Sequence, residues 1–150
     1  MFKKKTNILF LVIVLLICGC MHKKALNPSE YKDYMKRNHY SVSNVTDSYN
    51  YGGLLKAYKA STKDYSIIYY QLENNEQAVN FYENSQVNLE LTKISNSKKT
   101  QVLSKNYSKY TSTSSDSYLV ISRIDNTVIY ASVNKKDKPK VDKVINKLGY

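Results

Sequence analysis

The chain has 150 residues, which suits a single domain, and a formal net charge of +11. Its two cysteines both lie within the first 20 residues, so the folded part has no disulfide, no cysteine nucleophile and no thiolate metal site. Only Arg37 and Arg123 among the 23 basic residues are arginines, which disfavours nucleic acid as a partner because base readout relies on the guanidinium fork.

The N-terminus has the organisation of an export signal. Three lysines at positions 3–5 precede an apolar run over residues 8–17. A membrane-spanning helix needs about 20 apolar residues, and this run is roughly half as long. That size is typical of the hydrophobic region of a signal peptide, so the segment is left out of the fold.

The end of the apolar run resembles the lipobox of bacterial lipoproteins, in which an aliphatic residue and two small residues precede a cysteine. The four residues are Ile17, Cys18, Gly19 and Cys20. The resemblance implies cleavage between Gly19 and Cys20 and a diacylglycerol thioether on Cys20. Residues 1–19 are then the signal peptide and residues 20–26 a lipidated tether. The alternative is an uncleaved N-terminal anchor with two unmodified cysteines.

A helix is expected to begin at the tether's end. Asn27 and Glu30 have the spacing of a capping box, and Pro28 suits the first helical position. The helix is expected to end near Asn38.

Two strands are expected next, over residues 54–60 and 65–72, after a turn at Gly52 and Gly53. A further short strand over residues 42–45 is left open. In the second strand Tyr65 and Tyr69 share one face and Tyr70 the other, so one set belongs to the core and the other either lies under a helix or forms a contact patch.

A second helix is expected from Asn74, which has capping-box spacing to Gln77. We expect it to reach about Thr92. Alternating apolar residues over 87–91 leave open that its last part is a strand.

The C-terminal half is expected to be richer in strands. Residues 95–100 are interpreted as a polar loop and residues 102–111 as one strand. Residues 118–124 and 127–133 predict a hairpin, because Asp125 and Asn126 between them tolerate positive φ.

The last helix is expected after Pro139, where apolar residues recur at one-face spacing and Gly149 marks the stop: Val141, Val144, Ile145 and Leu148. The order α-β-β-α-β-β-β-α predicts one α+β domain over residues 27–150. We expect a single antiparallel sheet of about 4–5 strands with helices packed on one face. This half, ending in Leu148-Gly149-Tyr150, loosely resembles small lipoproteins of Gram-positive bacteria, and that resemblance implies no activity.

Residues that commonly catalyse reactions or bind metals are scarce. The two histidines, His22 and His39, have no ligand-spaced partners. No glycine-rich phosphate loop or nucleophile elbow occurs, and the acids are scattered among lysines. We therefore expect no enzyme activity, no cofactor and no metal site. An enzyme with an unrecognised site is the least favoured alternative.

One cluster is a candidate contact site for an anionic polymer. Lys105, Tyr107 and Lys109 alternate within the expected strand and would share one face, with Arg123 near them. The competing interpretation, which we favour, is an edge strand whose lysines prevent pairing with other chains.

These features predict a lipid-anchored, non-catalytic binding or interaction module on the extracytoplasmic face of the cell membrane. The sequence does not identify its partner, and an envelope protein is one candidate. The alternative is a basic protein that binds an anionic wall polymer, either teichoic acid or peptidoglycan. For the positive charge itself we favour the simpler interpretation, a lysine-rich surface that only maintains solubility.

Overall fold

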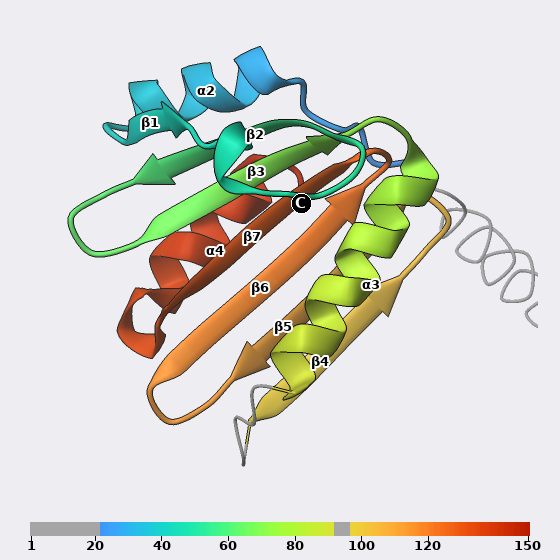
Figure 1. Ribbon diagram of the computed structural model, residues 1–150. Helices are drawn as coiled ribbons and strands as arrows, with labels where there is room; N and C mark the ends of the chain where they lie inside the picture. Colours follow the sequence, from blue (N-terminus) through green and yellow to red (C-terminus); the bar gives the residue numbers. More distant parts are fainter. Residues whose placement is uncertain (1–21, 92–96) are drawn as a thin grey trace, which may run out of the picture.

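A computed structural model describes residues 22–91 and 97–150 (Figure 1). The signal peptide and the lipobox lie outside the described residues. The helices are α2 (Pro28–Arg37), α3 (Asn75–Leu91) and α4 (Lys138–Lys147), and two short 3₁₀ helices are η1 (Thr46–Ser48) and η2 (Lys135–Asp137). The strands are β1 (Ser41–Asn44), β2 (Leu54–Ser61), β3 (Ser66–Leu72), β4 (Lys98–Leu103), β5 (Tyr107–Thr113), β6 (Ser117–Ile124) and β7 (Thr127–Asn134).

The strands form one antiparallel sheet of seven strands in the order β1-β2-β3-β7-β6-β5-β4. The α+β class and the single antiparallel sheet are therefore confirmed. The sheet is larger than the expected 4–5 strands, and the element order differs. The pairing of β3 with β7 joins the N-terminal strands β1–β3 to the C-terminal strands β4–β7, and it places Tyr69 opposite Ile129.

Helices cover both faces of the sheet, so the prediction of one covered face is wrong. On one face, α2 and α4 pack on a core that includes Ile67 and Val120. On the other face, α3 packs on a core that includes Leu72 and Ile121. The central strands β3, β6 and β7 have to bury both sets of side chains, which explains their uninterrupted apolar runs.

The predicted strand over residues 102–111 is wrong, because a turn divides it into a hairpin. Strand β4 ends at Leu103, β5 begins at Tyr107, and Ser104 N donates to Tyr107 O across the turn at 2.7 Å. Residues 98–100, expected in a loop, belong to β4. All six side chains of β4 are exposed, so backbone pairing with β5 rather than burial forms this edge strand.

Two of the three predicted helix starts, at Asn27 and Asn74, are confirmed, whereas α4 begins at Lys138 rather than after Pro139. Asn27 Oδ1 accepts bonds from the backbone N–H groups of Ser29 and Glu30 at 2.9 Å, and Glu30 Oε2 accepts one from Asn27 N at 2.9 Å. Gln77 N donates to Asn74 Oδ1 at 2.9 Å. Helix α3 runs to Leu91, which decides against a strand over residues 87–91.

Tyrosines make up much of the α2 and α4 face of the core. Tyr31 and Tyr69 stack with ring centroids 5.0 Å apart. The Tyr31 hydroxyl donates to Ile67 O, and the Tyr69 hydroxyl donates to Leu26 O, each at 2.8 Å. Each ring is buried while its hydroxyl keeps a partner, which is the condition under which a buried tyrosine stabilises a core.

We predict that the free energy of unfolding falls as the pH rises from 10 through about 12. Burial raises the pKa of Tyr82 and Tyr150 to about 12 and raises that of Tyr31 and Tyr69 further. The folded state therefore favours the neutral phenol. This stability is fully present below the unfolded-state pKa of about 10 and is lost as the pH rises through the folded-state values. Urea unfolding at a series of pH values measures the fall. Complete tyrosinate absorbance near pH 10 in a folded chain would contradict it.

We predict that Gly53→Ala lowers the free energy of unfolding by about 1–3 kcal/mol. Gly53 has φ +81°, and a Cβ there would overlap the Gln77 side chain. Gly52→Ala is the matched control, since a Cβ at Gly52 meets nothing within 4 Å. Urea denaturation compares the two variants, and an equal effect at both positions would show that Gly53 has no special backbone role.

Candidate functional site: an aromatic groove beside α3

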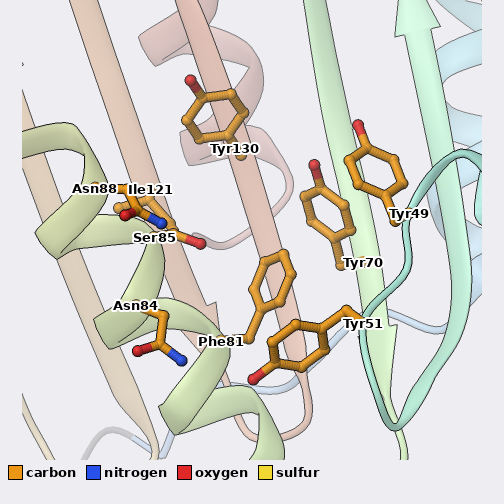
Figure 2. A pocket seen from close by; sticks show the side chains of 9 residues that line it. All are labelled: Tyr49, Tyr51, Tyr70, Phe81, Asn84, Ser85, Asn88, Ile121 and Tyr130. Carbon is orange, nitrogen blue, oxygen red and sulfur yellow. The ribbon is translucent and has the colours of Figure 1, made fainter. Parts of the chain in front are cut away.

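A groove of about 380 Å³ lies between α3 and the segment that leads from η1 into β2. Strands β3, β6 and β7 form its floor (Figure 2). Ring-bearing side chains predominate in its lining, which comprises Tyr49, Tyr51, Tyr70, Phe81, Asn84, Ser85, Asn88, Ile121 and Tyr130. This size and mostly apolar lining with a few polar groups are typical of ligand pockets.

The rings of the groove hold one another in place. Neighbouring residues of a strand point to opposite faces of the sheet. Tyr70 therefore projects from β3 toward α3, while Tyr69 lies on the other face. Phe81 of α3 packs on Tyr70 at 4.8 Å between ring centroids. Tyr49 meets Tyr70 edge-on at 5.2 Å, and Tyr51 meets Phe81 edge-on at 4.9 Å. The wall is therefore preorganised by edge-to-face contacts that add to simple burial.

The segment that carries Tyr49 and Tyr51 is fixed by polar contacts at its start. Asn44 Oδ1 accepts a bond from Thr46 N at 3.0 Å, and Thr46 Oγ1 accepts one from Ala57 N at 2.9 Å. Short polar side chains of this kind hold turns by bonding nearby backbone. The two tyrosines therefore follow a turn that these hydrogen bonds hold in place.

The described lining carries no charged side chain. Burial raises the pKa of Tyr70, with a further rise from the Tyr49 hydroxyl, and burial also raises the pKa of Tyr130. These hydroxyls therefore stay protonated and can donate hydrogen bonds. The amides of Asn84 and Asn88 on α3 both donate and accept.

Among the described residues that line the groove there is no histidine, lysine, cysteine or carboxylate side chain. Residues 22–91 and 97–150 hold no group of three or more His, Cys, Asp or Glu side chains placed to bind a metal ion. The arrangement suits recognition of an uncharged ligand.

Two residues of the predicted polymer site do share one face of β5, but both are occupied within the fold. Lys109 Nζ donates to Tyr150 O at 3.3 Å. The Tyr107 ring lies under Lys23, with Nζ 4.0 Å from the ring centroid. The face they share is the one that carries α2 and α4.

The other two residues of that predicted set lie elsewhere. Lys105 is in the turn between β4 and β5 and not on the strand, so the expected alternation of three residues on one face is wrong. Arg123 pairs in register with Ser108 on the opposite face of the sheet and is 3% exposed. Its guanidinium donates to Asn75 Oδ1 at 2.7 Å and to Asp125 O at 3.2 Å, which ties α3 to the β6–β7 hairpin.

The sequence analysis missed most of the groove. Tyr70 was recognised as one of two alternatives for a contact patch, whereas Tyr49 and Tyr51 lay in a segment interpreted only as polar. A usable signal existed on α3, where Phe81, Ser85 and Asn88 are spaced i, i+4 and i+7 and therefore share a helix face. Small polar groups in line with an aromatic residue are unusual for a face that packs on a sheet.

Comparison with protein-family models, with curated proteins and with solved structures finds no match to the chain. Among the described residues, no helix combines the length and the hydrophobicity that crossing a membrane requires.

We predict that Arg123→Met lowers the free energy of unfolding by about 2 kcal/mol or more, because it leaves Asn75 Oδ1 and Asp125 O without a buried donor. Lys105→Met is the matched control, since Lys105 is exposed and should change stability by less than about 0.5 kcal/mol. Chemical denaturation measures both. An Arg123→Met variant as stable as the control would show that Arg123 is dispensable to the fold.

Proposed function

We propose that the protein is a non-catalytic interaction module, anchored by a lipid on Cys20 to the extracytoplasmic face of the cell membrane. Its aromatic groove receives an uncharged segment of an envelope protein. The observation that carries this proposal is the preorganised groove itself, with aromatic walls on two sides and hydrogen-bonding groups on α3.

The chemistry of the groove favours a protein segment with apolar or aromatic side chains. Tyrosine is enriched among the residues that dominate binding energy at protein interfaces, because it offers a large rigid ring and a polar tip. The Asn and Ser side chains on α3 suit the backbone of such a segment. An anionic polymer finds no cation in the described lining.

The proposed location rests on the sequence. The lipobox-like residues Ile17 to Cys20 follow a short apolar run, and a diacylglycerol group supplies the two acyl chains that stable anchoring takes. Lys23 and Lys24 follow directly and add attraction to anionic lipid.

Charge-driven binding of a wall polymer is less well supported by the geometry than it was by the sequence. Its four candidate residues are divided between a turn and two faces of the sheet, and Arg123 and Lys109 already have partners inside the fold. A wall glycan stays the alternative occupant of the groove, and the experiment below separates it from a protein.

We predict that a photo-crosslinking amino acid at Ser85, in the full precursor produced by living cells, forms a covalent adduct with one envelope protein. Ser85 lines the groove, whereas Val87, two residues further along α3, is exposed and does not. The same amino acid at Val87 is the matched control and should give no adduct. Gel mobility and mass spectrometry of the purified adduct identify its partner.

A second variant combines the crosslinker at Ser85 with Tyr51→Ala and tests whether the groove selects the partner. The Tyr51→Ala change removes the ring that contacts Phe81 but little buried structure. The yield of adduct should therefore fall at least tenfold while the fold persists. Equal adducts at Ser85 and Val87, or an adduct indifferent to Tyr51→Ala, would overturn the groove as the binding site. An adduct that muramidase digestion shortens would assign the groove to a wall glycan instead.

A further inference from the structure

The N-terminal segment is held against one end of the sheet from its first described residues. Asn106 Nδ2, in the turn between β4 and β5, donates to Lys23 O at 2.7 Å and lies 3.3 Å from His22 Nε2. Lys23 Nζ donates to Gly149 O at 2.7 Å. These contacts fix where the chain enters the domain, at the end of the sheet that carries turn 104–106 (Figure 1).

Exposed apolar side chains lie beside this entry point. Val102 and Leu103, the last two residues of β4, are 52% and 66% exposed. They are two of the four large hydrophobic side chains that are exposed in the described part of the chain, and they are adjacent. Because neighbouring residues of a strand point to opposite faces, the pair places apolar groups on both sides of the sheet's edge. Each therefore keeps more than half of its surface exposed within the described fold.

Basic side chains belong to the same end of the sheet. Lys105 lies in the turn that begins after Leu103, and the exposed Lys24 belongs to the docked segment. Two acids lie among them: the Asp125 carboxylate is 3.9 Å from His22, and the Glu30 carboxylate is 3.8 Å from Lys24 Nζ. Exposed apolar groups flanked by lysines are the composition of surfaces that rest in a membrane interface, where apolar groups enter the acyl boundary and lysines meet anionic headgroups.

The distance to the proposed anchor is short. Cys20 precedes His22 by two residues, and an extended chain spans at most about 3.6 Å per residue. The lipid on Cys20 would therefore lie within roughly 7 Å of the His22 backbone. Because His22 and Lys23 are bonded to Asn106, turn 104–106 has to stand at the membrane surface as well.

We infer that Lys24, Val102, Leu103 and Lys105 form a membrane-contact corner that seats the domain on anionic lipid headgroups. This inference rests on the proposed attachment of the chain near Cys20. The partner is the lipid surface itself, and the corner gives the domain one orientation relative to it.

The test uses the full chain, processed by its host and reconstituted in vesicles that contain phosphatidylglycerol and phosphatidylcholine. Leu103→Cys carries an environment-sensitive fluorophore. The matched control carries it on Ser115→Cys, in the exposed turn between β5 and β6, which the length of β5 separates from the corner. Mass spectrometry of the same samples determines whether Cys20 is lipidated and residues 1–19 are removed.

We expect the emission of the label at Leu103 to shift to the blue in these vesicles and that of the label at Ser115 to stay as in water. Lys105→Glu should reduce the shift at Leu103, and so should vesicles of phosphatidylcholine alone. An unshifted emission at Leu103 on vesicle-bound chain would overturn the membrane-contact corner, whatever the mass shows.

The mass readout judges the anchor separately. A diacylglycerol adduct on Cys20 with an aqueous label at Leu103 would leave the lipoprotein proposal standing and remove the corner. An uncleaved chain would overturn the lipoprotein proposal, but residues 1–19 would still bring His22 to the membrane. The emission of the label at Leu103 would then test the membrane-contact corner independently of the lipid on Cys20.

Discussion

The fold depends on the burial of strands β3, β7 and β6 on both faces at once. A chain without disulfides in its described part obtains its stability from burial, and each fully buried Ile or Leu contributes about 1.5–3 kcal/mol. Alternating side chains of these strands supply two separate cores, one beneath α2 and α4 and the other beneath α3. Tyr31 and Tyr69 extend the first of these cores outward, since each ring fills space while its hydroxyl bonds the backbone.

This two-sided arrangement also explains why a groove exists. Helix α3 is the only long helix on its face within the described residues, and it spans β6, β7 and β3 without covering the sheet toward β2. The segment around Tyr49 and Tyr51 approaches from the other side and stops at Phe81. Aromatic rings line the space between α3 and this segment but do not fill it. The alternation of side chains that builds the core thus also leaves a recognition surface on the face that carries α3.

Local chemistry made much of the fold predictable. The capping box at Asn27, the N-cap at Asn74, the β6–β7 turn with its positive φ at Asp125, and the apolar stripe of α4 were all visible as patterns of a few residues. The second covered face was missed, although runs such as Leu119-Val120-Ile121 do not alternate as a half-exposed strand would. Strand β4 was not readable. Its sequence is polar, its turn has neither glycine nor proline, and only pairing with β5 makes it a strand.

The candidate site was harder to predict than the fold. Lys105, Tyr107, Lys109 and Arg123 are close in sequence or in hairpin register, yet the turn at 104–106 and the pleat of the sheet separate them. The groove instead unites Tyr51, Tyr70 and Phe81, which belong to three elements and meet only through tertiary packing. A pattern within one segment carries no information about such a meeting.

The pairing of β3 with β7 bears on when the domain can form. Asn126 and Leu72 are bonded at that junction although they lie 54 residues apart in the chain. The centre of the sheet therefore closes only after β7, the last strand in the chain, has been supplied. High sequence separation of this kind slows folding, because loop-closure entropy is spent before the contacts form. During synthesis the first half of the chain therefore cannot complete its sheet until β7 has been made, and the final helix follows that strand directly.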